Sequence, residues 1–273
     1  MPAIQLLKKQ LRGIKSTQKL TKAMRTVSTV KFSKLNGIYT NYAQFGRNCV
    51  SMYENYKTGF VSALPKTDKE APVLIIVIAS DKGLCGSFNS ELLNFALEYI
   101  EGMDFPYLLM PYGKRAVSFF KDRNFELVSE NDLGDNPTYA QAEKLLSDIV
   151  SMMGSGKISS VRVVYPKYYN MMKQKPVAAK LFEADSEDAE TDIVFVPDKK
   201  TFVTKSANTV LASVLYEILL ESALGAQAAT LMTMRSAYDT ATEYCEQLEG
   251  QINRQRQSAV TADVIETSSE VIS

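Results

Sequence analysis

The chain has 273 residues, enough for one large or two modest domains, and its 31 basic and 31 acidic side chains cancel to a formal net charge of zero. It contains no histidine, which excludes histidine-based catalytic triads, histidine metal sites and the usual side-chain pH switch near neutrality. Cys49, Cys85 and Cys245 lie far apart, so we expect neither a disulfide framework nor a cysteine metal site, and a reducing compartment fits. The longest uninterrupted apolar run, residues 73–79, is far shorter than the roughly 18 residues of a membrane span, so no span is expected.

Proline placement divides the chain into three parts. Eight of the nine prolines fall between Pro65 and Pro197, which leaves residues 3–64 and 198–273 without any. Because proline costs about 3 kcal/mol inside a helix, this distribution favours two long terminal helices around a compact middle. We therefore expect a coiled-coil helix over residues 1–60, an α/β domain over 70–200 and a second coiled-coil helix over 205–273.

Apolar residues recur along both terminal segments at alternating spacings of three and four. They are Ile4, Leu7, Leu11 and Ile14, then Ile38, Tyr42, Phe45, Cys49, Met52 and Tyr56, and finally Leu231, Met234, Tyr238, Ala241, Cys245, Leu248 and Ile252. This spacing is typical of coiled-coil packing. Helices over residues 3–57 and 206–270 would be about 80 and 100 Å long, too long to be covered by the middle domain. We expect them to pack on each other in antiparallel orientation.

Charge is distributed unevenly between the two terminal segments. Residues 1–53 carry ten basic side chains and no acidic one, whereas residues 206–273 carry three basic and nine acidic ones. The two expected helices should therefore attract each other. Much of this charge could serve only as a solvated surface, but a basic helix without acids is unusual, because mixed charges form stabilising pairs along a helix.

The middle of the chain alternates strand-like and helix-like segments, which predicts a parallel sheet. We expect strands over residues 73–80, 107–112, 125–128, 159–165, 177–183 and 193–196. Helices are expected over residues 87–102 and 114–122, and a third begins with a capping box of Thr138 and Gln141 and ends near Met153. The strands within 159–183 should form an antiparallel hairpin, and the acidic stretch 183–192 a mobile loop.

Residues 80–87 form a glycine-containing turn between the first expected strand and the helix that follows. Asp81, Gly83, Cys85 and Gly86 belong to it. Such a turn can bring backbone groups close to an anion at a helix N-terminus, but this one matches neither GxxxxGK[ST] nor GxGxxG. We interpret it as a structural turn with capping and expect no bound cofactor or metal; nucleotide binding and a nucleophilic Cys85 are the disfavoured alternatives.

Basic side chains near the N-terminus step by four, three, four and three along one helical face. They are Lys8, Arg12, Lys15, Lys19 and Lys22. Contact with an acidic partner and a merely solvated face are the two main interpretations, and nucleic acid or anionic lipid is a third. No aromatic residue precedes Phe32, so stacking on nucleic-acid bases is not expected.

Two further segments are candidates for contact with a partner. Arg254, Arg256, Gln257 and Thr261 lie in a terminal segment otherwise poor in basic residues, and an arginine fork there could reach a partner carboxylate. The segment 165–172 is rich in Tyr and Met. It is interpreted as a hairpin end packed on its own core, with a partner surface as the alternative.

Three segments together resemble the gamma subunit of the F-type rotary ATP synthase. Residues 17–24 (TQKLTKAM) and 80–89 (SDKGLCGSFN) are similar to that family's N-terminal and central signatures. Asn253, Arg256, Gln257, Val260, Thr261 and Glu266 are similar to its C-terminal signature. Order and spacing match over essentially the whole chain. The chain departs from the family at Ala226 and Thr230, where an acidic residue and an arginine are usual, which puts in doubt any polar contact at that turn.

The resemblance implies a fold and a role. The terminal helices would form an antiparallel coiled-coil shaft inside a hexamer of three alpha and three beta subunits. The middle would be a Rossmann-like α/β domain without nucleotide, resting with the epsilon subunit on the membrane c-ring. Such a chain is a non-catalytic central-stalk rotor, peripheral to the cytoplasmic face of a bacterial plasma membrane. The alternatives are a nucleotide-dependent α/β enzyme and a basic coiled-coil adaptor that binds nucleic acid or anionic membrane.

The resemblance also implies contacts for individual residues. The basic stripe from Lys8 to Lys22, together with Arg25, would face acidic segments of beta. A set of polar contacts with one beta subunit, which we call the polar catch, would be formed by Arg256, Gln257 and Thr261. Met24 would lie close to a beta loop.

Overall fold

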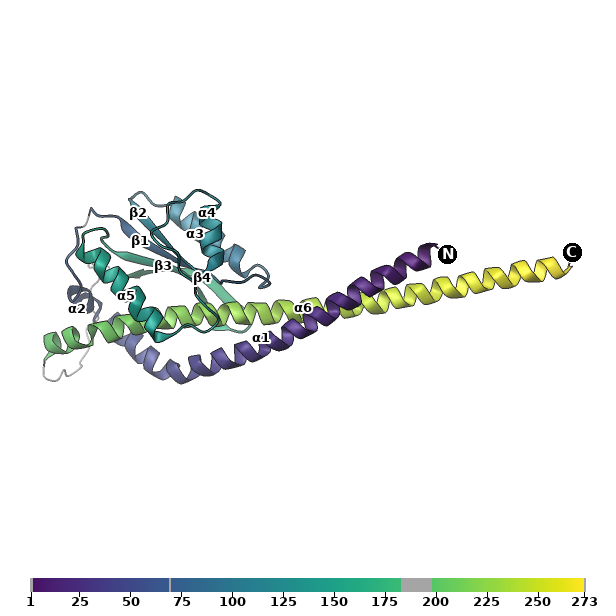
Figure 1. Cartoon of the computed structure of the whole chain (residues 1–273). Coiled ribbons are helices and arrows are strands. Elements are labelled where there is room, and N and C mark those ends of the chain that lie inside the picture. The colour runs from purple at the N-terminus through teal and green to yellow at the C-terminus, as the bar shows by residue number, and fades with distance from the viewer. Residues whose placement is uncertain (1, 69, 183–197, 273) are drawn as a thin grey trace. The chain divides into compact units, whose positions relative to one another are not determined.

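The computed structural model describes residues 2–68, 70–182 and 198–272 (Figure 1). The elements in chain order are α1 (Pro2–Asn55), α2 (Lys57–Ser62), β1 (Val73–Ile78), α3 (Phe88–Glu101), β2 (Tyr107–Tyr112), α4 (Lys114–Lys121), α5 (Tyr139–Gly154), β3 (Val161–Asn170), β4 (Lys173–Leu181) and α6 (Lys199–Ile272). The chain forms two compact units. The helical unit comprises Met1–Thr29 and Leu231–Ser273, and the sheet unit comprises Val30–Thr230.

In the helical unit, the first part of α1 and the last part of α6 run antiparallel. Lys15 on α1 pairs with Glu249, whereas Arg25, further along α1, lies over Tyr238, earlier on α6. This confirms the expected antiparallel pairing. The α6 side of the seam is as predicted, because Met234, Ala241, Cys245 and Leu248 are buried.

The α1 side of this seam is less apolar than a coiled coil usually requires. Ile4, Leu7, Leu11 and Ile14 are half-buried, but the next buried positions are Thr21 and Ser28. Between them, the amide of Gln18 donates a hydrogen bond to the Thr242 hydroxyl at 2.8 Å. The seam therefore combines apolar packing with small and polar side chains.

The sheet unit contains a four-stranded sheet in the order β2-β1-β3-β4. β1 pairs in parallel with β2 and β3, and β4 pairs antiparallel with β3, which confirms the expected hairpin. The chain leaves β1 toward β2 and then returns past β1 to β3. Right-handed crossovers therefore place α3 and α5 on opposite faces of the sheet. This is the predicted α/β arrangement.

The sheet is buried on both faces. Ile75 and Val77 of β1 pack with Leu92 of α3 and Phe120 of α4. On the other face Leu74, Ile76 and Ile78 are also buried. Figure 1 shows α6 on this second side, and there the hydroxyl of Tyr139 on α5 donates to the carbonyl of Thr209 on α6 at 3.2 Å.

α6 has a segment apolar enough to cross a membrane by length and composition alone. It contains no long uninterrupted apolar run, because single polar residues interrupt it. The sequence analysis therefore did not predict it as a possible span. The share of this segment that is buried inside the protein is 89%. A helix buried in the core of a soluble protein has the same composition, so this finding is weak support for a span.

Segment 125–128, expected as a strand, forms only an isolated bridge between Leu127 and Leu109 of β2. The N–H of Val128 donates to the Leu109 carbonyl, but Pro111, two residues further along β2, has no N–H to continue a ladder on that edge. The prediction of a strand there was wrong. The strand expected at 193–196 and the loop expected at 183–192 lie outside the described residues.

Phe45, predicted in the seam of α1, has 49% of its surface exposed, and Gly46 is buried instead. A Cβ at Gly46 would lie 2.7 Å from the Glu217 Oε2 atom of α6. The glycine thus lets α6 come close at this point, and the buried stripe of α1 shifts by one residue.

Hairpin β3–β4 is longer than expected and includes the aromatic segment 165–172. Tyr165 is buried, and Tyr168 meets Tyr39 of α1 edge to face, with 6.1 Å between ring centroids. Tyr169 and Met172 near the tip are exposed. The base of the hairpin is therefore packed on its own core, and the tip is free for other contacts.

Candidate functional site

The basic stripe of α1 is on the surface. All five of its members are exposed: Lys8, Arg12, Lys15, Lys19 and Lys22. Lys15 Nζ lies 2.6 Å from Glu249 Oε1 on α6 in the same unit, and this hydrogen bond raises the pKa of the Lys15 ammonium. One member of the stripe is thus engaged with the partner helix, and the other exposed members leave a basic face in solvent.

Met24 and Arg25 are both half-buried in the helical unit. The guanidinium of Arg25 lies over the ring of Tyr238, with 4.7 Å from Cζ to the ring centroid. Such a contact favours a cation by about 0.5–1 kcal/mol at a partly exposed site. Arg25 therefore has a role inside the helix pair as well as the partner contact predicted for it from the sequence.

Near the end of α6, Arg254, Arg256, Gln257 and Thr261 are exposed. The Thr261 hydroxyl donates to the Gln257 carbonyl at 2.9 Å, within the helix. The arginine and glutamine side chains are thus presented on the surface, and the neighbouring Val260, Val264 and Ile265 are exposed as well. An exposed apolar and basic helix end of this kind is suited to contact with another protein.

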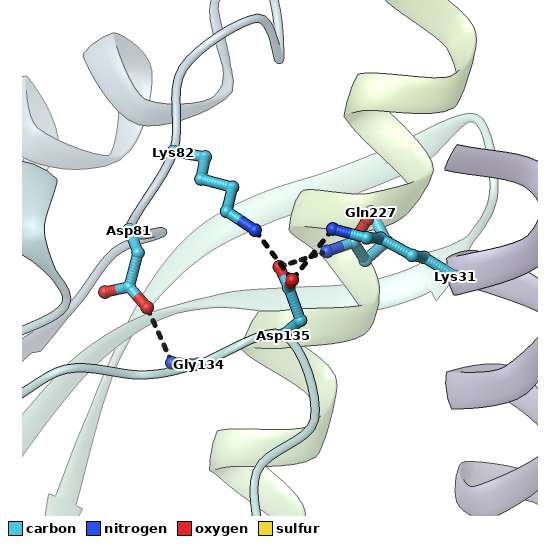
Figure 2. Close-up of polar contacts among 6 residues, drawn as sticks. All are labelled: Lys31, Asp81, Lys82, Gly134, Asp135 and Gln227. Atoms are coloured by element: carbon cyan, nitrogen blue, oxygen red, sulfur yellow. Dashed lines mark hydrogen bonds and ion pairs between the residues drawn. The ribbon is translucent and has the colours of Figure 1, made fainter. Parts of the chain in front are cut away.

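In the turn after β1, the Asp81 carboxylate accepts hydrogen bonds from three backbone N–H groups. It accepts from the N–H groups of Lys114 at 3.0 Å and Leu133 at 3.2 Å. It also accepts from the Gly134 N–H at 2.6 Å, the contact drawn in Figure 2. Lys114 is the first residue of α4, so Asp81 caps that helix and fixes the loop after Asn131. An internal carboxylate thus takes the hydrogen bonds that a bound anion would receive at this helix N-terminus.

The same turn is held by Asn89 on the first turn of α3. Its amide nitrogen donates to Ser80 Oγ at 2.8 Å and to Cys85 Sγ at 3.0 Å. Cys85 is buried beside Phe88 and Ala226, which argues against a nucleophilic role. Ser87, the N-cap of α3, makes no side-chain capping bond among the described residues, so the turn caps α4 and not its own helix.

The two glycines of the turn, Gly83 and Gly86, are required by different features of its geometry. Gly86 has φ +62°, a conformation that glycine adopts without strain. Gly83 lies beside Arg115, and a Cβ there would come 2.5 Å from the Arg115 Nη2 atom. Both glycines are therefore explained by the local geometry of the turn.

Asp135 was missed in the sequence, although side chains from three other parts of the sheet unit contact its carboxylate (Figure 2). Its Oδ2 atom lies 2.8 Å from Lys31 Nζ on α1 and 2.6 Å from Lys82 Nζ on the turn, and its Oδ1 atom accepts from Gln227 Nε2 on α6 at 3.2 Å. Burial acts to raise the pKa of Asp135, but the two lysines outweigh it and lower the pKa. We call Asp135, Lys31, Lys82 and Gln227 the Asp135 cluster.

The chain's departures from the family pattern are on α6 in the sheet unit. Ala226 is buried against Cys85 and Phe88, and the Thr230 hydroxyl donates to the Ala226 carbonyl at 2.8 Å. Ala226 thus makes an apolar contact with the turn after β1. The polar link between α6 and that region is made by Gln227, through the Asp135 cluster.

The described residues include no group of three or more His, Cys, Asp or Glu side chains that could hold a metal ion. A cleft of about 730 Å³ lies beside the end of β2. Lys114, Lys121 and Lys144 line it together with Asp132 and Asp148, so it has no single sign of charge that would favour a nucleotide.

Comparison with known proteins decides the family. A family model described as "ATP synthase" matches residues 3–270. An ATP synthase gamma chain from Leptospira biflexa is 30% identical over 95% of this chain and 95% of its own length. The chain belongs to the ATP synthase gamma chain family. The gamma chain of Pelotomaculum thermopropionicum is 27% identical, with 97% of each chain covered.

Chains in two solved ATP synthase complexes have the same fold. A chain of the Euglena gracilis mitochondrial ATP synthase matches with a TM-score of 0.69 at 16% identity, covering 99% of this chain and 94% of that one. A chain from the central stalk and c-ring of the Tetrahymena thermophila mitochondrial ATP synthase matches with a TM-score of 0.59 at 23% identity, covering 80% of this chain and 99% of that one. At these identities the likeness shows the fold alone.

Proposed function

We propose that this gamma-family chain is the central-stalk rotor of a membrane-associated ATP synthase. A gamma chain is a non-catalytic subunit of that complex. In this proposal ion flow turns the c-ring, the chain turns with it, and the catalytic sites on three beta subunits change affinity in sequence. The observation that carries the proposal is the family match from residue 3 to residue 270, together with the antiparallel pair of long helices.

The surface of the helical unit suits rotation inside a sleeve of alpha and beta subunits. Lys8, Arg12, Lys19 and Lys22 are exposed, long and flexible. Exposed ion pairs contribute only about 0–1 kcal/mol each, so such side chains can attract acidic partner segments without locking the rotor at one angle. We propose that this stripe faces acidic segments of beta.

The exposed end of α6 suits a more specific contact. Arg256 can bind a carboxylate through two parallel hydrogen bonds, which a lysine cannot do. Gln257 and Thr261 lie beside it. We propose that these three residues form the polar catch with one beta subunit.

In the proposal the sheet unit contacts the epsilon subunit and the c-ring, at the cytoplasmic face of a bacterial plasma membrane. The exposed tip of hairpin β3–β4, with Tyr169 and Met172, is one surface available for such a contact. The turn after β1 is satisfied internally by Asp81, which supports a Rossmann-like domain that works without a nucleotide.

Reconstitution with matching alpha and beta subunits tests the proposal. We expect native mass determination to give a complex of three alpha, three beta and one copy of this chain, with ATP hydrolysis that depends on the chain. A folded chain that joins no such complex, and instead binds DNA or anionic vesicles with a steep salt dependence, would establish the adaptor function in its place.

The position of Met24 gives a residue-level test in the same complex. Met24→Lys would place a new cation beside a beta loop, so we expect ATP hydrolysis to continue while the number of ions pumped per ATP falls. Ala23→Lys, at an exposed neighbouring position, is the matched control and should pump normally. Equal pumping by both variants would remove Met24 from the proposed contact.

A further inference from the structure

The polar cluster around Asp135 joins parts of the sheet unit that are far apart in the sequence. Lys31 lies on α1, Lys82 on the turn after β1, and Gln227 on α6. Figure 2 shows the Lys82 side chain reaching the Asp135 carboxylate from one side and the Lys31 and Gln227 side chains reaching it from the other. Neither oxygen of that carboxylate is left to solvent alone, because each accepts at least one of these contacts.

The loop that carries Asp135 is anchored on both sides. On one side, the N–H groups of Leu133 and Gly134 donate to Asp81. On the other side, Thr138 begins α5 with a capping box, in which Thr138 and Gln141 each satisfy the other's backbone N–H. A force on the Asp135 side chain therefore reaches the ends of β1, α4 and α5 through a short, hydrogen-bonded path.

Much of the packing of the sheet against the two helices is apolar. A further polar contact joins them, because the Phe182 N–H after β4 donates to the Tyr53 hydroxyl of α1 at 3.1 Å. Apolar packing depends on the area removed from water and has no preferred direction, so it resists separation better than sliding. Hydrogen bonds and ion pairs weaken steeply when their angle changes, so they resist sliding. Twisting the sheet around the helix axes is a sliding motion, and the Asp135 cluster opposes it.

We propose that Asp135 is a positioning residue that transmits torsional load between the α/β sheet and the helices α1 and α6. The proposal rests on the rotor function proposed above, since only a rotor carries such a load. Lys31 and Gln227 are the two arms that reach the helices, and Lys82 and Asp81 tie the loop to the turn after β1. The cluster thereby makes the sheet and both helices turn as one body.

The test measures torsional stiffness in the assembled complex. Met172 has 82% of its surface exposed and the three native cysteines are buried. A rod-shaped optical probe can therefore be attached specifically to the thiol of a Met172→Cys chain, at hairpin β3–β4. The alpha and beta subunits are fixed to a surface and rotation is stalled, so the part of the helix pair inside them is held still. The variance of the rod's angle then measures how easily the chain twists between hairpin β3–β4 and that held part. We expect Asp135→Asn to increase this variance above that of the parent complex.

A control and a rescue separate load transmission from general stability. Asp132→Asn removes a carboxylate from the same loop, one that pairs with Lys114, and should leave the variance unchanged. Asp135→Glu keeps the carboxylate and should restore most of the stiffness. Equal variance for Asp135→Asn and the parent would overturn the proposal, even if the variant unfolds more easily.

Single-arm variants cover the case in which Asp135→Asn does not assemble. Lys31→Gln and Gln227→Ala each remove one arm, and Lys34→Gln is the exposed control one turn along α1. Each arm variant should raise the variance less than Asp135→Asn, and Asp135→Asn/Lys31→Gln should be no worse than Asp135→Asn, because both changes break the same contact. Parent-like variance in both arm variants would contradict the inference. A parent complex that assembles but never rotates would contradict the rotor function itself.

Discussion

α6 passes through two environments, and its composition differs in each. In the sheet unit, every residue from Val210 to Ala226 except Glu217 is buried, as a helix surrounded by sheet and other helices requires. Among the residues of the helical unit whose burial is described, α6 buries only one stripe, which includes Met234, Ala241 and Cys245. This stripe lies against an α1 seam that contains Thr21 and Ser28. The sheet unit therefore gains most of its stability from apolar burial, whereas the helical unit has less to gain and presents most of its surface to solvent.

The largest expected effect contrasts two leucines of α6. Leu219→Ala, at a fully buried position of the sheet unit, should lower the free energy of unfolding by about 2–5 kcal/mol. Leu248→Ala, at the edge of a two-helix seam that can collapse around the change, should cost about 1–2 kcal/mol. Denaturant unfolding of the full chain gives both values. Equal losses would mean that the two parts of α6 are held equally firmly.

Removing the Asp81 carboxylate tests the internal capping of the sheet unit. Asp81→Ala leaves the N–H groups of Lys114, Leu133 and Gly134 without their acceptor, and we expect a loss of about 2 kcal/mol because solvent reaches part of this site. Asp104→Ala, at an exposed position after α3, is the control and should be neutral. A neutral Asp81→Ala would show that water replaces all three bonds.

Glu221 makes the stability of the sheet unit depend on pH between its ordinary pKa and its raised one. Burial, with the charge of Glu217 as a second cause, raises the pKa of Glu221 to about 7, and Tyr39 donates to its carboxylate at 3.3 Å. The folded chain therefore binds a proton that the unfolded chain releases, and stability should fall as pH rises from about 4.5 to about 7.

The variant Glu221→Gln keeps the hydrogen bond from Tyr39 but cannot ionise. It should stabilise the chain by about 1–2 kcal/mol at pH 8 and by much less at pH 5. Thermal unfolding across this pH range measures the difference, with the exposed Glu246→Gln as control. A pH-independent effect of Glu221→Gln would contradict the assigned ionisation.

The smallest expected effect compares one ion pair from each unit. Lys15 and Glu249 are each about half exposed, with 49% and 48% of their side-chain surfaces in solvent, so Lys15→Gln should not change the unfolding free energy measurably. Lys31 shares Asp135 with Lys82 and Gln227, and Lys31→Gln should cost about 0.5–1 kcal/mol in low salt. The reverse ranking would show that the helical unit depends on its surface charges.

The parts predictable from the sequence are those set by local spacing. The buried α6 seam follows from the recurrence of Met234, Ala241, Cys245 and Leu248, and the start of α5 follows from the capping box at Thr138. The Asp135 cluster was not predictable, because its members come from residues 31, 82, 135 and 227 and no local pattern relates them. The shift from Phe45 to Gly46 depends on how closely α6 approaches, which is a tertiary property.

The most direct test of the rotor function is to watch the chain turn. A Met172→Cys chain is labelled with a rod on hairpin β3–β4 and assembled with alpha and beta subunits fixed to a surface. On addition of ATP we predict unidirectional rotation of the rod in three equal steps per turn, one for each beta subunit. A complex that hydrolyses ATP with the rod still attached and not rotating would contradict the account.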